Sequence, residues 1–393
     1  MTILWGRVKA RTKRLVRLAR QKYSSLRNRR TDRVNLYQLA RRGTSLPAGM
    51  TVLARPAGTK PRRTVRRAQS DQVYGDRGWV DATPTIYEPE IDGDWVLEIQ
   101  DVRVASHGEM QLADERWVQF PFLNIHYPRG HSTEGVVMTI DEPVWIVPNG
   151  SDAFGHWLLH VMPRIHRARQ LDPTKRILTR RPRWNPAGLL EMVGLTVDDV
   201  IWYPVESPDG AYVHVAHGTL VSHAAPRGNA QVHPLQTSRF DSMVDDFVEV
   251  ARGIPSPAGP RLYVSRSSND PAARRDGCQN RDELEAYFAS KGFDVVYPEK
   301  HRFVEQVAMF RDATVVVAEG GSGGHNTLFS AFGTKLMYIS ARMDPRNNHW
   351  QRRIADLRTL NYRHLTPTTE FTQRSYTVEM DVVRAAYESL GWD

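Results

Sequence analysis

The chain has 393 residues, of which 40% are hydrophobic and 25% charged, and these values suit a soluble globular protein with two domains and an extension. No stretch reaches the roughly 18 apolar residues that a membrane-spanning helix needs, and the N-terminus lacks the apolar core of a signal peptide. The single cysteine, Cys278, excludes an internal disulfide, which suits a reducing compartment. The composition therefore predicts a cytoplasmic protein.

Charge is distributed unevenly along the chain. Residues 1–70 contain 20 Lys and Arg and a single acid, Asp32, whereas the rest of the chain has a net charge of −10. Leucines at helical spacing among the basic residues of 1–30 predict a basic amphipathic helix. We expect residues 1–67 to bind an anionic membrane surface at its inner face; a solvated, disordered tail is the alternative. Nucleic-acid binding is disfavoured for the whole chain and stays open only for this tail.

Proline, glycine and charge divide the chain into three parts. Residues 1–72 form a basic tail and linker, 73–252 an N-terminal domain, and 261–393 a C-terminal domain, with a Gly- and Pro-rich boundary before it. Apolar and alternating runs in the N-terminal domain predict strands at 95–99, 102–104, 136–140, 144–147, 177–179 and 213–215 and helices at 154–170 and 236–252. Pro163 is expected to bend the first of these helices or to end its first part.

The C-terminal domain alternates short apolar strands with helices. The pattern predicts strands at 261–265, 294–297, 314–318 and 335–339 and helices at 281–291, 303–311, 324–332 and 378–390. Asn280 is expected to cap the first of these helices, with Glu283 three residues on, as in a capping box. Such alternation predicts a parallel, Rossmann-like sheet with helices on both faces.

A glycine-rich run joins a buried strand to a helix in this domain. It reads Glu319-Gly320-Gly321-Ser322-Gly323-Gly324-His325-Asn326. Glycines let the backbone approach a ligand closely, and the free N–H groups at the start of a helix suit a phosphate. The run matches neither the P-loop nor the dinucleotide fingerprint, and a tight strand–helix turn without a ligand would look the same.

Ser265 and Arg266 follow the first strand of the C-terminal domain. Parallel strands of one sheet end at the same edge, so Arg266 is expected beside the glycine-rich run. A guanidinium there could grip two oxygens of a diphosphate. A surface ion pair is the alternative for this arginine.

His156 and His160 lie four residues apart and therefore share one face of the predicted helix at 154–170. The spacing could hold zinc, but no third ligand follows at a recognisable spacing and the sequence differs from His-Glu-x-x-His. A histidine at the start of a helix that faces a cleft is a suitable general base for a sugar hydroxyl. A hydrogen-bonded packing histidine is the alternative.

Several short motifs follow one another in a fixed order. They are His156-Trp157 with Pro163-Arg164, Tyr263-Val264-Ser265-Arg266, Asn280-x-Asp282-Glu283, Gly292-Phe293-x-Val295-Val296, Phe303-x-Glu305-Gln306 and the glycine-rich turn that closes on Asn326. With these spacings the set resembles family 61 glycosyltransferases from about residue 95 to 345. Two positions depart from the family pattern: Gly320 stands where the family's turn has a histidine, and His160 stands where an acid often follows His-Trp.

The resemblance implies an α/β fold with two Rossmann-like domains of the GT-B type and a basic N-terminal extension. It implies a bacterial-type cytoplasmic hexosyl- or pentosyltransferase that moves a sugar from a nucleotide-sugar donor to a polysaccharide or glycolipid, with inversion and without a metal or other cofactor. The expected catalytic residues are His156 and Glu319. The expected donor-binding residues are Ser265, Arg266, Asn280, Glu305, Gln306, Gly320, Gly321, Ser322, Gly323, Gly324, His325 and Asn326. A catalytically inactive glycan-binding relative is the alternative.

Overall fold

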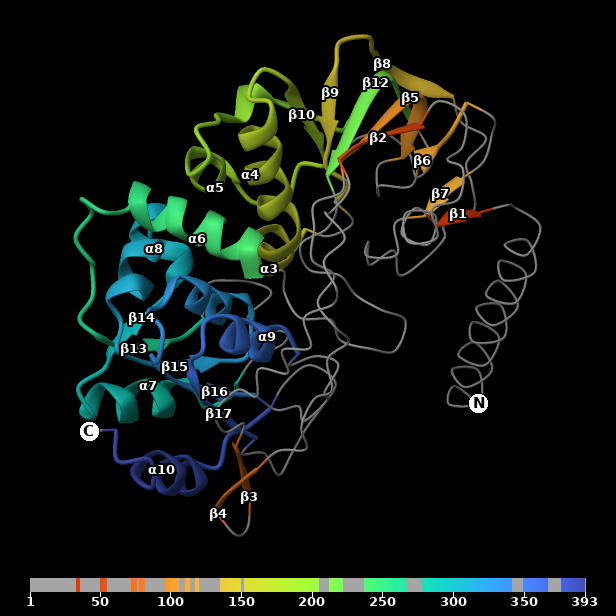
Figure 1. Ribbon diagram of the computed structural model, residues 1–393. Helices are drawn as coiled ribbons and strands as arrows, with labels where there is room; N and C mark the ends of the chain where they lie inside the picture. Colours follow the sequence, from red (N-terminus) through yellow and green to blue (C-terminus); the bar gives the residue numbers. More distant parts are fainter. Residues whose placement is uncertain are drawn as a thin grey trace, which may run out of the picture.

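The structure is a computed structural model with two β-sheets and helices packed between and around them (Figure 1). It describes residues 96–105, 110–113, 135–149, 152–204, 212–221, 237–266, 278–340, 349–366 and 376–392. It also gives the backbone of five short strands, namely β1 (Arg33–Asn35), β2 (Met50–Ala54), β3 (Gln72–Gly75), β4 (Gly78–Asp81) and β7 (Trp117–Gln119). The helix predicted for residues 1–30 lies outside the described residues.

The first sheet has ten strands and is mixed. Besides β1, β2 and β7 it contains β5 (Val96–Ala105), β6 (Met110–Gln111), β8 (Val136–Ile140), β9 (Val144–Ile146), β10 (Arg176–Thr179), β11 (Val200–Trp202) and β12 (Tyr212–Val221). The β12-β9-β10-β11 part is parallel, whereas β5 runs antiparallel to β12, β2 and β6. This mixed pairing differs from the parallel sheet of a Rossmann-like domain, which was predicted for this half of the chain.

The parallel strands of the second sheet agree with the prediction from the sequence. Its strands are β13 (Arg261–Val264), β14 (Asp294–Val296), β15 (Val315–Glu319), β16 (Lys335–Ile339) and β17 (Asn361–Leu365), in the order β14-β13-β15-β16-β17. All five are parallel to their neighbours, and β3 extends the sheet in parallel beyond β17. After β13 the chain forms β14 on one side of it and then β15 on its other side. The direction of the strand order therefore reverses between β13 and β15, and this is the topological switch point of the sheet.

Two of the predicted domain limits differ from the strand pairing. β1 and β2 lie in the part predicted as tail and linker, yet they join the first sheet. β3 and β4 lie at the border of the predicted N-terminal domain, yet they join the second sheet. These strands have three to five residues, which is too short for an apolar period to stand out in an Arg-rich sequence.

The helices occupy the predicted places with a few corrections. They are α3 (Phe154–His156), the π-helix η1 (Trp157–Val161), α4 (Met162–Leu171), α5 (Ala187–Glu191), α6 (Thr237–Val250), α7 (Arg281–Ser290), α8 (Phe303–Asp312), α9 (His349–Leu357) and α10 (Met380–Glu388). Three 3₁₀ turns add η2 (Val197–Asp199), η3 (Pro298–Lys300) and η4 (Ser322–Phe329). The helix predicted at 324–332 is therefore a 3₁₀ helix that starts earlier and ends earlier, and α5, α9, β11 and β17 were not predicted.

A π-helical segment precedes Pro163, and the helix continues through this proline without the predicted end. Five residues directly before α4 form η1, and the N–H of Met162 donates to the carbonyl of Trp157, five residues back. Proline has no N–H to give to an α-helical ladder, and a π turn absorbs that irregularity without ending the helix. The buried guanidinium of Arg164 then donates from Nε to the carbonyl of His160, 2.7 Å away.

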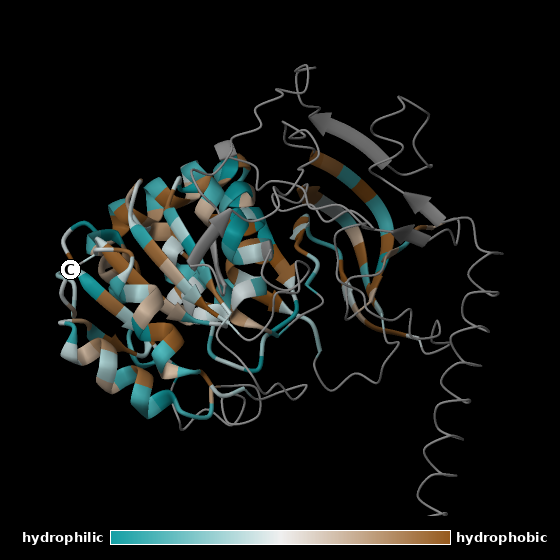
Figure 2. Cartoon of the chain, turned by 90° about the horizontal axis from the view of Figure 1, so that it is seen from below, coloured by the Kyte–Doolittle hydropathy of each residue, from teal (hydrophilic) through white to brown (hydrophobic). Residues whose placement is uncertain are grey.

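One apolar core joins the two sheets. In β15, Val316 and Ala318 face the core shared with the first sheet, whereas Val315 and Val317 face the separate core under α7 and α10. Between the sheets, Phe247 of α6 stacks on Phe329 with ring centroids 6.0 Å apart. Hydrophobic residues therefore recur on the helix faces turned inward, as the alternating bands in Figure 2 show.

His364 of β17 gives the fold a dependence on pH. Its Nε2 lies 3.1 Å from the hydroxyl of Ser340, and burial, with a contribution from Arg352, lowers the pKa of His364 from 6.5 to about 4. The folded state thus favours the neutral ring, and its stabilising effect is complete above pH 6.5 and is lost as the pH falls toward 4.

We expect the wild type to lose roughly 2–3 kcal/mol of unfolding free energy through His364 between about pH 7.5 and pH 4.5. His364→Gln retains a polar group beside Ser340 but cannot titrate, so its loss over the same range should be smaller by that amount. Urea denaturation at both pH values measures the difference. Equal losses in wild type and variant would show that this histidine does not set the pH dependence.

Candidate active site

The candidate site lies at the carboxyl ends of β13 and β15, beside the switch point of the second sheet. β15 ends at Glu319, and the glycine-rich turn leads directly into η4. β13 ends at Val264, so Ser265 and Arg266 leave the sheet at the same edge. In open α/β sheets ligands bind in the crevice outside this edge, at such a switch point.

The backbone of the turn uses two of its N–H groups internally. Gly320 donates to the carbonyl of Ile339 at 2.8 Å, and Gly321 donates to the hydroxyl of Tyr338 at 3.1 Å. The expectation that these two groups face a ligand is therefore wrong. Ser322 and Gly323 form the first turn of η4, where N–H groups have no acceptor within the helix. An anion bound at the turn would therefore be held by the N–H groups of this first turn of η4.

Arg266 and the turn lie together, as their places at the sheet edge predicted. Gly321 has φ 151°, a region that favours glycine. A Cβ at Gly321 would lie 3.4 Å from Cδ and 3.6 Å from Cζ of Arg266. The side chain of Arg266 thus crosses directly over the glycine, and a larger residue there would push it aside.

The start of α3 touches the same turn from the first half of the chain. A Cβ at Gly155 would overlap the imidazole of His325 and lie 3.1 Å from the hydroxyl of Ser322. Only glycine permits so close an approach of the helix to the turn. His156, the predicted base, is the next residue of this helix.

Histidine and tryptophan rings line the helix beyond Gly155. The rings of His156 and His160 stack with centroids 5.0 Å apart, and Trp350 of α9 meets His160 edge-on at 4.6 Å. Gln351 of the same helix donates to the hydroxyl of Thr327 in η4 at 2.7 Å. α9 therefore contributes side chains to the site in addition to α3 and the turn. This helix was not predicted from the sequence.

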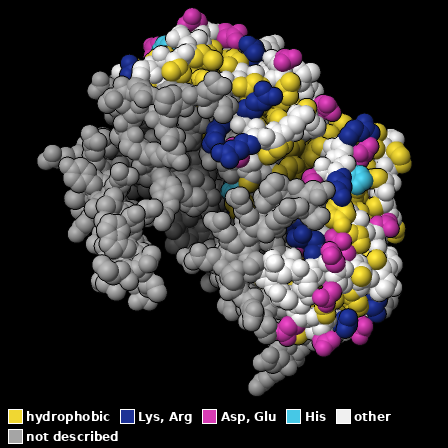
Figure 3. Space-filling view, turned by 180° about the vertical axis from the view of Figure 1, so that it is seen from behind, with side chains coloured by type: hydrophobic (Ala, Val, Ile, Leu, Met, Phe, Trp, Pro, Cys, Tyr) yellow, Lys and Arg dark blue, Asp and Glu magenta, His cyan; other side chains and the backbone are white. Residues whose placement is uncertain are grey.

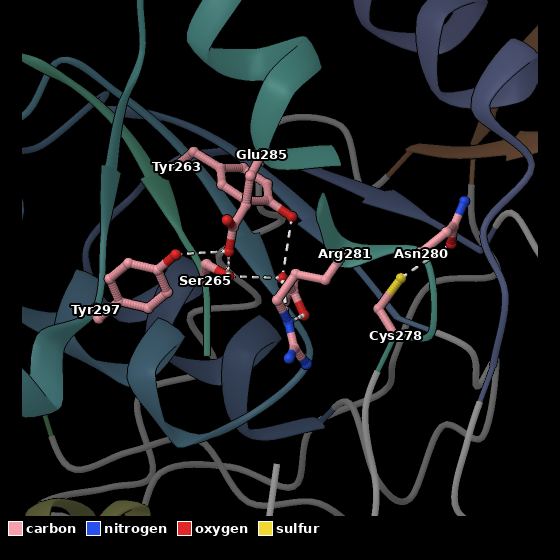
Figure 4. A network of polar contacts seen from close by, with 8 residues as sticks. Tyr263, Ser265, Cys278, Asn280, Arg281, Glu285 and Tyr297 are labelled. Carbon is pink, nitrogen blue, oxygen red and sulfur yellow. Dashed lines mark hydrogen bonds and ion pairs between the residues drawn. The ribbon is translucent and has the colours of Figure 1, made fainter. Parts of the chain in front are cut away.

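Glu319 lies below the turn in a network of polar groups (Figure 4). Its carboxylate is 1% exposed and accepts hydrogen bonds from the hydroxyls of Tyr263 at 3.0 Å and Ser265 at 3.1 Å. Arg281 donates from Nε to both of its oxygens at 3.2 Å. Burial raises the pKa of Glu319, and these donors partly offset the rise. A substrate hydroxyl could reach this carboxylate only after the contacts were broken.

A second carboxylate extends the network. Glu285 accepts from the hydroxyl of Ser265 at 2.6 Å and from the hydroxyl of Tyr297 at 2.9 Å. Ser265 thus lies within hydrogen-bond distance of two acids, although it has only one proton to donate. Its hydroxyl is committed to these carboxylates, so the predicted direct contact of Ser265 with a donor is not part of this arrangement.

Two other predicted site residues, Asn280 and Glu305, bond to neighbouring parts of the fold. The side chain of Asn280 precedes α7 but does not cap it, because it bonds to the N–H and carbonyl of Val378. Glu305 caps α8 through the N–H of Arg302 at 2.9 Å. The capping box predicted for α7 is therefore wrong, and a box forms at α8 instead.

Gln306 and Asn326 bond to each other. The amide of Asn326 donates to Oε1 of Gln306 at 2.9 Å, and both side chains are buried. This contact fixes η4 to α8, so the two residues hold the turn from below and do not face its outer side. Sequence spacing placed them in one region but could not show that they point at each other.

Charged groups of both signs lie close together on the outer surface. Figure 3 shows basic and acidic side chains interspersed over one face of the described part of the molecule. Within the described ranges, no group of three His, Cys, Asp or Glu side chains could hold a metal ion. No helix among these residues is long and apolar enough to cross a bilayer.

The fold and the site together define an α/β protein with an arginine and a glycine-rich turn at a sheet switch point, facing a histidine-bearing helix. Residues 154–337, from the start of α3 into β16, match the family model described as Glycosyltransferase 61. This match supports a family 61 glycosyltransferase, and glycosyl transfer is the activity that it supports. A search of curated proteins gave no match.

Proposed function

We propose that the protein transfers a sugar from a nucleotide-sugar donor to a hydroxyl group of a polysaccharide or glycolipid. The donor's diphosphate binds against Arg266 and the first turn of η4, in a GT-B-type arrangement with the second sheet on the donor side. The close approach of Gly155 to His325 and Ser322 carries the proposal, because it brings His156 beside this turn.

In the proposed reaction His156 takes the proton of the acceptor hydroxyl. The oxygen attacks the anomeric carbon, the bond from that carbon to the diphosphate oxygen breaks, and the configuration inverts. The nucleoside diphosphate leaves with the electron pair of that bond. Arg266 and the N–H groups of η4 stabilise the added negative charge, which a metal ion does in many other enzymes. We assign the proton transfer to His156 alone, because the carboxylate of Glu319 is buried and bonded.

The acceptor and the surroundings of the enzyme are part of the same proposal. We infer that the basic residues 1–67 bind an anionic membrane from the cytoplasmic side and bring the enzyme to a membrane-borne acceptor. The inactive glycan-binding relative stays the second candidate, because Gly320 replaces the histidine of the family's turn.

Release of nucleoside diphosphate tests the proposed activity. The purified protein is incubated with a panel of nucleotide sugars, with and without bacterial glycolipid extract, and the released diphosphate is measured by chromatography. We expect one donor to be consumed faster with the extract than without it. Binding of glycolipid without consumption of any donor would instead favour the inactive relative.

A further inference from the structure

Arg281, the first residue of α7, has the features of a second phosphate-binding group. Its side chain is 11% exposed, and the hydrogen bonds of its guanidinium to described residues all use Nε, which faces Glu319. Its Nη2 is buried and has no hydrogen-bond partner in the part of the chain that the structure describes. A buried donor without an acceptor is costly, and a ligand oxygen would remove that cost.

The orientation of Arg281 is fixed from behind. Nε lies 3.2 Å from each oxygen of Glu319, whose position is held in turn by Tyr263 and Ser265. In Figure 4 the terminal nitrogens of Arg281 point away from Tyr263 and Ser265. Burial works against the charge of Arg281, but the nearby Glu319 raises the pKa of the guanidinium, so it stays protonated.

Topology places this guanidinium at the proposed donor site. Glu319 is the last residue of β15, directly before the glycine-rich turn, and Ser265 directly precedes Arg266. Arg281 therefore reaches the edge where β13 and β15 end, although it lies 16 positions after Ser265 and 15 after Arg266 in the sequence. Two arginines on separate segments can bind the two phosphate groups of one diphosphate.

We propose that Arg281 binds the diphosphate of the donor together with Arg266, with Glu319 holding it in place. This inference rests on the proposed function, since it names a further residue of the same donor site. Glu319 then serves the reaction by orienting an arginine and not by moving a proton. Neither a phosphate-binding role for Arg281 nor an orienting role for Glu319 was predicted from the sequence.

Inorganic pyrophosphate is the probe, because it carries the diphosphate without base or sugar. Its affinity is measured by calorimetric titration of wild type, Arg281→Lys, and the double variant Arg281→Met with Glu319→Gln. The double variant removes both buried charges at once and so leaves no unpaired carboxylate that would destabilise the fold. Arg384→Met is the matched control, because this arginine lies on the exposed side of α10, where it contacts Asp381 and the ring of Tyr287 but no group of the site.

We expect the double variant to bind pyrophosphate about 10- to 100-fold more weakly than wild type, as for the loss of a charged hydrogen-bond donor. Arg281→Lys keeps the charge but loses the second nitrogen, so a smaller loss is expected at an unchanged melting temperature. The control should bind like wild type.

Affinities of Arg281→Lys and the double variant within twofold of wild type would overturn the inference. If Arg266→Ala then still weakened pyrophosphate binding, the proposed function would stand and only the role of Arg281 would fall. If wild-type protein bound neither pyrophosphate nor any nucleoside diphosphate, the proposed function would fall as well.

Discussion

Replacing Arg266 with alanine is expected to weaken the binding of a nucleoside diphosphate by roughly 1.5–3 kcal/mol, the usual contribution of a charged hydrogen bond. Binding of the bare nucleoside should change little, because the guanidinium contacts only the phosphates. Calorimetric titration of wild type and variant with both ligands measures the difference. Arg384→Ala, on the exposed surface of α10, controls for the loss of one positive charge. Equal weakening of both ligands, or of neither, would make Arg266 structural.

Gly321→Val is the companion variant for the same site. A side chain at this position would meet Arg266, and the φ of 151° disfavours any residue other than glycine. Gly333→Val is the control that distinguishes backbone strain from steric blocking of the site. Gly333 also has a positive φ, of 81°, but no atom lies within 4 Å of its added Cβ. Loss of diphosphate binding in the first variant only would identify the turn as part of the donor site.

His156→Ala is expected to lower turnover by about 100-fold or more, within the range for loss of a general base, while nucleoside diphosphate affinity stays nearly unchanged. The reason is that His156 directly follows Gly155, which approaches the turn, but is not proposed to contact the phosphates. Turnover is measured with the donor that wild type consumes. His217→Ala, an exposed histidine of β12, is the matched control.

A turnover within about tenfold of wild type, or roughly 1.4 kcal/mol in the barrier, would show that His156 is not the base. The structure then directs the search to His160, whose ring stacks on that of His156. Asp152 is a poorer candidate, because Arg180 and Arg183 lie 3.3 and 3.4 Å from its carboxylate. Glu319 is poorer still, because its carboxylate is 1% exposed.

The second sheet was largely predictable from the sequence, and the first sheet was not. Strands β13, β15 and β16 are largely buried on both faces and appear as continuous apolar runs between helices. β17 was missed because Arg363 and His364 interrupt its apolar pattern. The antiparallel pairing of β5 with β12 joins segments more than 100 residues apart, and no local pattern reports such pairing.

The parts of the site that depend only on strand order and helix periodicity were predictable from the sequence. The common edge of parallel strands placed Arg266 beside the turn, and helix periodicity placed His156 and His160 on one face of a helix. The direction in which a polar side chain points depends on partners distant in sequence: Asn280 bonds to Val378, and Arg281 bonds to Glu319. α9 was not predicted, although Trp350, Ile354 and Leu357 recur at helical spacing and are all buried, so this helix had a signal in the sequence.

The central claim is that the crevice beside β13 and β15 binds a nucleotide sugar. Its most direct test is the melting temperature of the purified full-length protein with each member of a panel of nucleotide sugars. A ligand at about 100 times its dissociation constant stabilises the native state by about 2.7 kcal/mol, which raises the melting temperature by several degrees. We predict that one nucleotide sugar and its nucleoside diphosphate raise it in wild type and that Gly321→Val abolishes the effect. An unchanged melting temperature with every nucleotide sugar would contradict the claim.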